Sequence, residues 1–459
     1  MRAARAAGGT PGRAAPRAAS SAHPIPRSAF GQAADAAKRS INLALSVRGQ
    51  AALRAAGVLD AVMAHAVPMP ARAIHPPGGG RVILQAYGRP GEAIYSVSRT
   101  VVNCALLDAA AALPAVRLHF STGFDALAAD GELTVARGAE RRASRPALVV
   151  GADGAFSAVR AALMRAERVD FARRFIPHAY KEIAMPAVGA ALGARAPPPA
   201  PGAAPAWALP QPHALHIWPR GDFMLIALPN PDGSFTATLF APWATFERLD
   251  AGEARGEAAV AAFFAAHFAD AAPLLPALAA QWAANPASAL VEVRVSPWAV
   301  GPAPRVLLVG DAAHATVPFY GQGMNAALED CLCFAEALDA RADGDARAAA
   351  AAFAAARGPA GAALCDLSME NYAEMSHKTA SAWFRARAAL ERALHAAAPR
   401  AWVPKYSLVT FSRVPYDEVV RQVRRQDAAL DAARAVVAVV GAGALAAAAA
   451  RAWAARARA

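Results

Sequence analysis

Apolar and polar residues alternate along several short runs in the middle of the chain, which is the pattern of strands with one buried face. Three such runs, at residues 215–218, 223–228 and 235–240, are separated by Pro, Gly, Asn and Asp residues that favour turns. They predict an antiparallel meander. Shorter apolar runs predict further strands at residues 81–87, 93–97, 116–120, 148–150, 291–295 and 305–309.

Small and apolar residues recur with helical spacing elsewhere. This spacing predicts helices at residues 47–66, 99–113 and 257–268, and a nearly continuous helical region from residue 323 to residue 397. Ser98 is in the position of an N-cap for the second helix. Glycines and a proline at residues 358–361 predict a break in the last region.

The composition limits the class of protein. The chain has 459 residues, of which 56% are hydrophobic and 18% charged, so extensive disorder is excluded. The formal net charge is +12, but residues 1–34 hold five arginines and no acid, and residues 421–459 hold seven arginines and two aspartates. The central body is close to neutral. This distribution favours targeting or contact with an anionic membrane, and it argues against nucleic-acid binding.

The two basic tails lead to separate predictions. Residues 1–37 lack apolar periodicity, which predicts a disordered leader or an Arg-rich transit peptide. Residues 435–450 are uncharged and lie between Arg434 and Arg451. Because a spanning helix needs about 20 apolar residues, this segment is either a marginal membrane anchor or an alanine-rich helix in water. The Pro-rich stretch at residues 195–205 predicts a loop.

The four cysteines are Cys104, Cys331, Cys333 and Cys365. Their spacing matches no metal site, because a C-x-C pair on a helix directs its side chains to different faces. We expect reduced thiols in a reducing compartment and no metal site.

The most informative motif begins with the apolar run that ends in Gly310-Asp311, followed by His314 and by the glycine-rich loop Gly321-Gln-Gly-Met-Asn325. Ligands of α/β sheets bind at the carboxyl ends of strands, where Asp311 can accept hydrogen bonds from sugar hydroxyls. The exposed amides at a helix start suit an anion. Taken alone, Asp311 is equally well explained as a helix cap.

A second strand leads into Gly151-Ala-Asp153-Gly154, again followed by a helix. Two strand–Gly-Asp turns in one chain predict a site for a large dinucleotide. His314 lies three residues after Asp311, and a residue in this place is more often a packing residue than a catalytic base.

Together these motifs resemble the flavin-dependent aromatic hydroxylases. Longer strings narrow the resemblance to the kynurenine 3-monooxygenase family and follow its order from about residue 38 to residue 425. They are Arg39-Ser-Ile-Asn-Leu-Ala-Leu-Ser46, Ser96-Val-Ser-Arg99, Leu215-His-Ile-Trp-Pro-Arg220, Leu225-Ile-Ala-Leu-Pro-Asn230, Asp366-Leu-Ser-Met-Glu-Asn371-Tyr and Val409-Thr-Phe-Ser-Arg413.

The resemblance implies an α/β fold in which an FAD/NAD(P)-binding, Rossmann-like domain is joined to an antiparallel β-sheet substrate domain and a helical C-terminal region. The expected parts are a leader (1–37), the FAD-binding domain (38–71, 98–172 and 301–360), the substrate domain (72–97 and 173–300), the helical region (361–430) and a membrane-anchor segment (431–459).

The activity implied by the resemblance is hydroxylation of L-kynurenine to 3-hydroxykynurenine, in tryptophan catabolism and pyridine nucleotide biosynthesis. FAD is reduced by NADPH and reacts with O2 to a flavin hydroperoxide, so no side-chain nucleophile is required. The family also implies attachment to the outer mitochondrial membrane, facing the cytosol, through the C-terminal segment.

The family's functional positions can be transferred residue by residue. The cofactor positions fall on Arg39, Ala44, Arg99, Phe124, Asp153, Asp311, Met324 and Asn325. The substrate positions fall on Arg72, Tyr87, Asn371 and Tyr406, with Pro318, Phe319 and Tyr320 as a wall for the aromatic ring. A guanidinium binds a carboxylate bidentately, and phenols and an amide add directional hydrogen bonds, so this set suits an amino-acid substrate.

The chain departs from the family pattern at its start. The family opens with a strand, a G-x-G-x-x-G turn and a helix, whereas the early glycines here, Gly8-Gly-Thr-Pro-Gly12, follow no apolar strand. The first βαβ unit is therefore expected to be incomplete. Two hypotheses remain: an FAD- and NADPH-dependent kynurenine hydroxylase, or a flavin-free, membrane-associated relative or truncated gene product without activity.

Overall fold

The computed structural model describes residues 42–190, 206–251, 256–374 and 382–456. The predicted leader, Arg39 and the predicted loop at residues 195–205 lie outside these ranges. Residues 41–459 belong to one compact unit.

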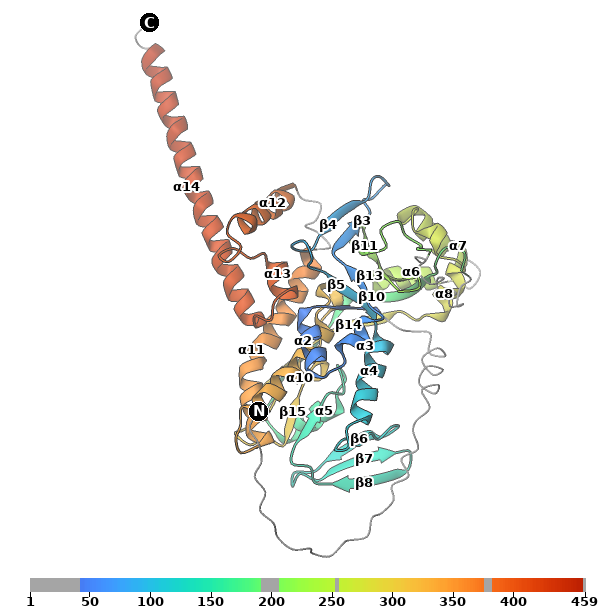
Figure 1. Ribbon diagram of the computed structural model, residues 1–459. Helices are drawn as coiled ribbons and strands as arrows, with labels where there is room; N and C mark the ends of the chain where they lie inside the picture. Colours follow the sequence, from blue (N-terminus) through green and yellow to red (C-terminus); the bar gives the residue numbers. More distant parts are fainter. Residues whose placement is uncertain (1–41, 191–205, 252–255, 375–381, 457–459) are drawn as a thin grey trace, which may run out of the picture. The chain divides into compact units, whose positions relative to one another are not determined.

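The largest element is a seven-stranded sheet in the order β14-β10-β13-β12-β11-β3-β4 (Figure 1). The strands are β3 (Ala71–Ile74), β4 (Ile83–Ala86), β10 (Asp170–Met185), β11 (Ala214–Pro219), β12 (Met224–Pro229), β13 (Phe235–Pro242) and β14 (Ser288–Ser296). The predicted meander is confirmed as β11, β12 and β13, which pair antiparallel. The predicted antiparallel substrate sheet is confirmed, with one parallel pair, β3 and β11, within it.

The two faces of this sheet pack against different parts of the chain. Trp218, Phe235 and Leu239 lie on a face covered by three helices, where they form the largest buried cluster. The covering helices are α6 (Trp243–Asp250), α7 (Gly256–His267) and α8 (Leu278–Ala284). Leu215 and Ile226 point to the opposite face of the same strands, where they pack with Tyr87 and Tyr406. The period-two alternation therefore gives each strand one structural face and one face toward the candidate site.

The nucleotide-binding part contains the parallel pair β9 (Val149–Gly151) and β15 (Val306–Leu308). These strands form a shared core with α5 (Ala158–Ala166), α9 (Asp311–His314) and α10 (Gly323–Asp339). Within the described residues, this pair is the parallel sheet of the nucleotide-binding part. The same residues contain no unit in which a strand leads through a G-x-G-x-x-G turn into a helix.

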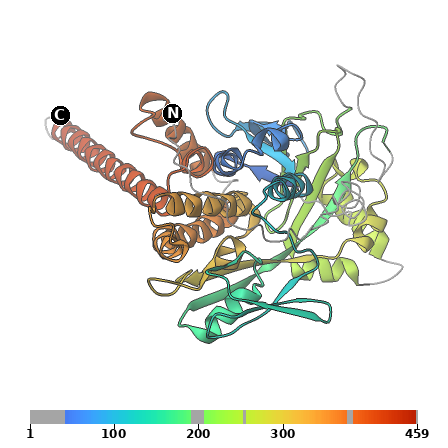
Figure 2. The same ribbon diagram turned by 60° about the horizontal axis from the view of Figure 1, so that its bottom comes forward.

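Two small antiparallel sheets complete this part. One has the order β1-β5-β2, from β1 (Asn42–Leu45), β2 (Val67–Met69) and β5 (Ile94–Ser98). Strand β5, which the expected boundaries assign mostly to the substrate domain, pairs with β1 in this sheet. The other sheet holds β6 (Gly123–Leu127), β7 (Leu133–Arg137) and β8 (Glu140–Ser144), and contacts α5 (Figure 2).

The C-terminal region is helical, as predicted. It consists of α11 (Ala346–Ala373), α12 (Ala382–Ala397), α13 (Lys405–Thr410) and α14 (Tyr416–Arg456). The predicted break at residues 358–361 was wrong, because α11 continues through Pro359. Gly361 is needed inside this helix: a Cβ there would lie 2.3 Å from Cζ2 of Trp298.

Other local predictions need correction. Residues 116–120 are not a strand, because this segment is largely exposed and the next strand begins at Gly123. The predicted helix at 47–66 is divided into α2 (Val47–Ala55) and α3 (Leu59–Met63) by Gly57, whose φ is +71°. Ser98 is the N-cap of α4 (Arg99–Ala111), without a side-chain capping hydrogen bond.

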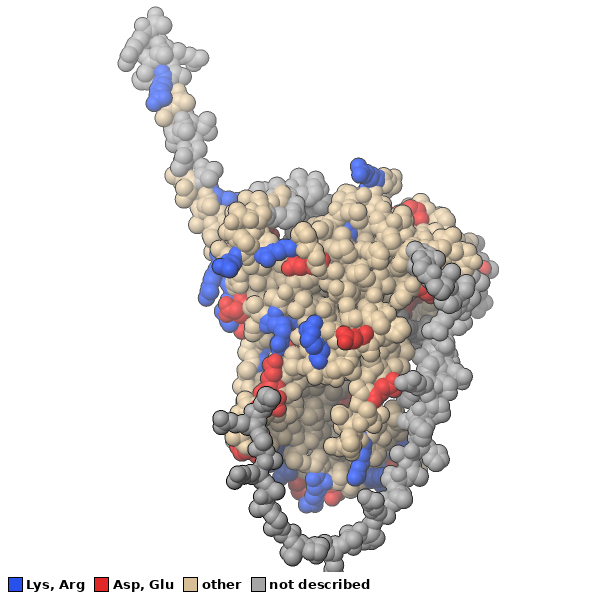
Figure 3. All heavy atoms as spheres, in the orientation of Figure 1, with Lys and Arg blue, Asp and Glu red and all other residues tan. Residues whose placement is uncertain are grey.

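One helix among the described residues, Ala346–Tyr372, is long and apolar enough to cross a membrane, but 56% of it is buried in the protein, as in the core helix of a globular domain. Helix α14 includes residues 435–450, and most side chains there lie outside the described set. All four cysteines are free thiols, as predicted. On the face shown in Figure 3, basic and acidic residues are interspersed.

Candidate functional site

Both Gly-Asp turns lie at the same edge of the parallel pair. Gly151 of β9 is opposite Leu308 of β15, so the turns that follow the two strands are neighbours. Gly154 and Gly310 have φ values of +83° and +56°, a conformation that disfavours other residues. The carboxyl ends of parallel strands are where α/β folds bind nucleotides.

Asp311 is the acidic group in these turns that the protein leaves available. Its carboxylate has no hydrogen-bond partner among the described residues, and the residue is exposed. Although its surface is accessible to solvent, the surrounding chain partly desolvates the carboxyl group and raises the pKa of Asp311, while the charges of His314 and Arg99 act to lower it. Arg99 is the first residue of helix α4, so a basic group from a separate segment contributes positive charge near the Asp311 carboxylate.

The Asp153 carboxylate is engaged within its own turn. Its carboxylate accepts hydrogen bonds from the N–H groups of Ala158 (2.7 Å) and Val159 (3.1 Å), which caps helix α5. Although burial acts to raise it, hydrogen bonds from Ser157 and Val159 hold the pKa of Asp153 below its usual value. The side chain thus fixes the turn and leaves the turn's backbone to face a ligand.

Asn325 joins the glycine-rich loop to strand β1. Its amide donates to the carbonyls of Ala44 and Gly321, each at 2.8 Å, and its oxygen accepts from the N–H of Ser46 at 2.8 Å. A Cβ on Gly321 would lie 3.3 Å from the Cβ of Ala44, so the two backbones approach closely. Met324 packs beside them. Phe124 instead packs against the β9–β15 core.

Four predicted substrate residues from four separate segments form one cluster. The guanidinium carbon of Arg72, on β3, lies 5.1 Å from the centre of the Tyr87 ring and 5.3 Å from that of Tyr406, on α13. The rings of Tyr87 and Tyr406 stack at 5.0 Å, and the rings of Tyr320 and Tyr406 stack at 5.9 Å.

Polar atoms in this cluster lack partners. Arg72 Nε and the Tyr87 hydroxyl are shielded from solvent and make no hydrogen bond to the described part of the chain. Burial, followed by the nearby Tyr406, raises the pKa of Tyr87 well above 10. Because unpaired buried polar atoms are costly, the cluster is suited to a ligand that supplies acceptors.

The aromatic wall lies next to this cluster. Residues 318–320 form the short 3-10 helix η2, Pro318–Tyr320. The amide of Asn371, near the end of α11, donates to the carbonyl of Phe319 at 2.8 Å. The Phe319 ring packs against Tyr372 at 4.6 Å and Phe240 at 5.2 Å. The Asn371 side chain thus contacts the backbone of the wall, not its rings.

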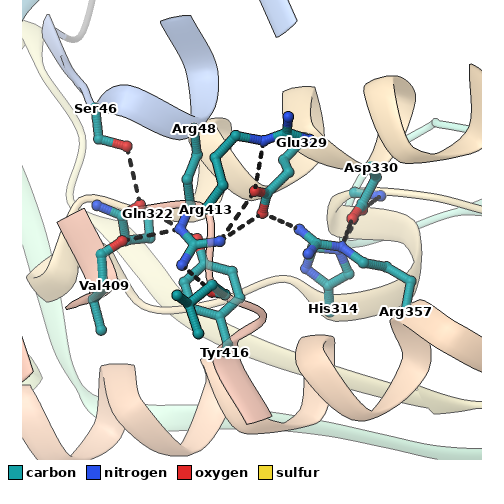
Figure 4. Close-up of polar contacts among 12 residues, drawn as sticks. Ser46, Arg48, His314, Gln322, Glu329, Asp330, Arg357, Val409, Arg413 and Tyr416 are labelled. Carbon is teal, nitrogen blue, oxygen red and sulfur yellow. Dashed lines mark hydrogen bonds and ion pairs between the residues drawn. The ribbon is translucent and has the colours of Figure 1, made fainter. Parts of the chain in front are cut away.

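A buried ion network, which the sequence did not predict, joins the two halves of the site (Figure 4). Arg48 Nη1 donates to both carboxylate oxygens of Glu329, at 3.0 and 2.9 Å. Arg357 bridges Glu329 (2.6 Å) and Asp330 (2.8 Å). All four side chains are less than a tenth exposed, so their charges are paired inside the protein.

Each end of the ion network holds a piece of the candidate site. At one end, Asp330 Oδ2 accepts from the N–H of Gly310 (3.0 Å) and pairs with His314 Nε2 (2.6 Å), which fixes the turn before Asp311. At the other end, Arg48 donates to the carbonyl of Val409 on α13, the helix of Tyr406. His314 is therefore a positioning residue, in keeping with the sequence prediction. The available signal was the adjacent acidic pair Glu329-Asp330, which begins four residues after Asn325 of the glycine-rich loop.

Comparison with known proteins agrees with this geometry. The family model described as "FAD binding domain" matches residues 35–173 and 284–368, which include both Gly-Asp turns. A kynurenine 3-monooxygenase from Salinispora tropica is 40% identical over 91% of this chain and 87% of its own length. One from Xanthomonas campestris pv. campestris is 43% identical over 82% and 79%. The structure of P. aeruginosa PqsL in complex with 2-aminobenzoylacetate aligns with a TM-score of 0.58 at 19% identity, over 75% and 88% of the two chains.

The fold and the paired Gly-Asp turns define an FAD-binding monooxygenase fold. The unpartnered Asp311 carboxylate and the close Gly321–Ala44 approach fit a bound dinucleotide. Sequence identity of 40% and 43% over most of the chain shows the family within this class: the chain belongs to the kynurenine 3-monooxygenase family.

Proposed function

We propose that the protein is an FAD-dependent monooxygenase that hydroxylates L-kynurenine to 3-hydroxykynurenine with NADPH and O2. The observation that carries the choice of substrate is the partly buried Arg72 guanidinium near Tyr87 and Tyr406, whose Nε is shielded from solvent and has no partner among the described residues. A partly buried cation with an unpartnered donor beside an aromatic wall suits a molecule that has both a carboxylate and an aromatic ring. The names of the curated relatives point to the same substrate.

The amino-acid end of the substrate is assigned to Arg72, Tyr87 and Tyr406. Arg72 pairs with the α-carboxylate, and the Tyr87 hydroxyl donates a hydrogen bond to it. Tyr87 stays neutral, because its raised pKa keeps the hydroxyl protonated at neutral pH. Asn371 is a positioning residue that holds the Phe319 carbonyl.

The aromatic end of the substrate is assigned to the wall at Pro318–Tyr320. Phe319, packed between Tyr372 and Phe240, gives this wall a fixed, apolar surface. Such a surface orients the ring and excludes water from the reacting carbon. The wall directly precedes the Gly321–Asn325 loop, so the aniline ring lies toward the cofactor side.

The cofactor is assigned to Asp311, Arg99 and the loop that Asn325 holds against Ala44. When bound, FAD supplies the activation of O2 and the transfer of one oxygen atom to the ring. Asp311 accepts hydrogen bonds from sugar hydroxyls, and Arg99 provides positive charge near the phosphates. The flavin-free alternative is not favoured, because the FAD-binding match includes both Gly-Asp turns.

An analogue without the carboxylate tests the assignment of Arg72. Kynuramine keeps the aromatic ketone and the amine of kynurenine but has no α-carboxylate. We expect the FAD-loaded protein to bind kynuramine roughly ten- to a hundredfold more weakly than L-kynurenine, since a charged hydrogen bond contributes about 1.5 to 3 kcal/mol. Equal dissociation constants for the two compounds would contradict the proposal.

The C-terminal segment carries a separate proposal, that residues 435–450 attach the protein to an anionic membrane surface. Its support is the uncharged stretch between Arg434 and Arg451 within helix α14. The relatives described above are bacterial, so they give no support to an outer mitochondrial membrane.

A further inference from the structure

A chain of titratable side chains lies on the far side of the seven-stranded sheet from the Arg72 cluster. His75 directly follows β3, the strand that carries Arg72, and His216 lies on the neighbouring strand β11. Asp270 lies between α7 and the short helix η1 (Ala272–Leu274). His216 and Trp218 share one face of β11, whereas Leu215 faces the Arg72 cluster.

Three short contacts connect these side chains in a row. Asp270 Oδ2 lies 2.6 Å from His75 Nδ1, and His75 Nε2 lies 2.9 Å from His216 Nδ1. His216 Nε2 lies 2.9 Å from the backbone carbonyl oxygen of Gln211. Both histidines are buried, with 5% and 0% of their surface exposed.

The backbone carbonyl at the end of the row fixes the positions of the protons. A carbonyl only accepts, so His216 Nε2 must carry a hydrogen. With His216 neutral, its Nδ1 accepts from His75 Nε2, which uses the single hydrogen of a neutral His75. The 2.6 Å contact between His75 Nδ1 and Asp270 then needs a third proton. Two neutral imidazoles and a carboxylate supply only two.

We propose that Asp270, His75 and His216 form a relay that holds one extra proton at neutral pH and thereby positions strand β3 with Arg72. The extra proton belongs to the relay as a unit, with most of the charge on His75 beside the Asp270 carboxylate. Deprotonation leaves two lone pairs facing each other. One of the three hydrogen bonds must then break, and the end of β3 loses an anchor.

The surroundings of the relay act in both directions. Trp218 Nε1 donates to both oxygens of Asp270, at 3.0 and 2.9 Å, and the Trp218 ring stacks on His75 at 4.0 Å, where an aromatic face favours a cation. Burial is the largest influence and lowers the pKa of His75 below its ordinary value, against the hydrogen bond and charge of Asp270, and Arg220 adds to the lowering. The three short contacts nevertheless require three protons. Arg220 also donates to the His75 carbonyl at 3.0 Å, so the Arg220 side chain contacts the end of strand β3 as well.

Nitrogen-15 NMR of the histidine rings in the FAD-loaded full-length protein tests the proton count directly. We expect both ring nitrogens of His75 to be protonated at pH 7.5, and His216 to be protonated at Nε2 alone. His75→Gln assigns the signals by their loss, and His119→Gln, at an exposed histidine outside the relay, is the matched control. An unprotonated nitrogen on His75 at pH 7.5, with His216 also neutral, would overturn the proposal.

Thermal unfolding provides a second readout that needs no activity. Free imidazole loses its proton near pH 6.5, so a relay that keeps its proton above this pH stabilises the folded state there. This contribution is lost as the pH rises through the value at which the folded relay releases the proton. The wild-type protein should lose stability with rising pH in this range, and His75→Gln should lack that loss. Parallel pH profiles of the two proteins would contradict the relay.

The effect on Arg72 rests on the proposed function. His75→Gln should raise KM for L-kynurenine by roughly two- to thirtyfold, the range of a coupling of 0.5 to 2 kcal/mol, with kcat nearly unchanged. In the wild-type protein, loss of the relay proton at alkaline pH should also raise KM. The variant should lack this pH-dependent rise. An unchanged KM in an active variant would overturn the positioning role. If the protein hydroxylates no kynurenine at all, the proposed function fails, while the NMR and unfolding results still decide the proton count.

Discussion

Arg72 concentrates the recognition of the substrate carboxylate in one side chain. We predict that Arg72→Ala raises KM for L-kynurenine by about ten- to a hundredfold, because a bidentate charged contact is lost. The FAD content of the purified variant should equal that of the wild type, since the cofactor contacts are on other elements. Steady-state kinetics with flavin absorbance checks both quantities. An unchanged KM would exclude Arg72 from the carboxylate site.

Asp311 and Asp153 follow the same kind of turn and yet differ in their contacts. Asp311 has no hydrogen-bond partner among the described residues, whereas Asp153 caps α5. We predict that Asp311→Asn weakens FAD binding by about ten- to a hundredfold, measured by titration of the flavin-free protein. Asp153→Ala should mainly lower the free energy of unfolding, by about 0.5 to 2 kcal/mol. The reverse pattern would show that the two roles are exchanged.

At the scale of elements, the ion network connects helices α2, α10 and α11 to the segment after α13. We predict that Glu329→Gln lowers the free energy of unfolding by about 3 to 5 kcal/mol, because Arg48 loses its buried carboxylate partner and Arg357 loses one of its two. Asp343→Asn, in the exposed Arg341–Asp343 pair, is the control and should change stability little. Chemical denaturation measures both. Equal effects would mean that the network adds no more than a surface pair.

The acid dependence of stability follows from the same network. Although burial acts to raise it, the charges of His314 and Arg357 hold the pKa of Asp330 below its usual value. A carboxyl group with a depressed folded-state pKa stabilises the protein above its unfolded pKa of about 3.9 and loses this contribution as the pH falls. The wild-type protein should therefore lose stability more steeply than Asp330→Asn below pH 4 in unfolding experiments.

The elements also show what the sequence could predict. Period-two runs such as β11 to β13 were identified correctly, because one buried face leaves a clear pattern. The false strand at residues 116–120 and the false break at 358–361 have different causes, since the first segment is exposed and has no sheet to join, whereas in the second a tertiary contact overrides local propensity. Trp298 against Gly361 makes the glycine a packing requirement of an intact helix. The strand β10 was not predicted, because exposed arginines interrupt its apolar pattern.

The candidate site was predicted unevenly for similar reasons. Motif resemblance assigned Arg72, Tyr87, Tyr320 and Tyr406 to one site, and the structure places them in one cluster although they are far apart in sequence. Their roles toward a substrate stay predictions. The ion network and the relay left no comparable motif, because each joins residues far apart in sequence. Asp153 was assigned to the cofactor from its turn, and the same residue type in the same turn also serves as a helix cap.

At the scale of the whole molecule, the residues assigned to the site all precede the last part of α14. We predict that a chain ending at Asp431 keeps the FAD content and kinetics of the full-length protein but no longer cosediments with anionic lipid vesicles, because the uncharged segment and its arginines are removed. Full-length protein with neutral vesicles is the control. Equal cosedimentation of the two chains would exclude the C-terminal segment as the attachment.

The measurement closest to the central claim is product formation by the purified, FAD-loaded protein. With NADPH, O2 and L-kynurenine, we expect 3-hydroxykynurenine in proportion to the NADPH consumed, identified by mass spectrometry. We also expect NADPH oxidation to be faster with L-kynurenine than without it. A protein that cannot be loaded with FAD, or that consumes NADPH without forming 3-hydroxykynurenine, would contradict the account.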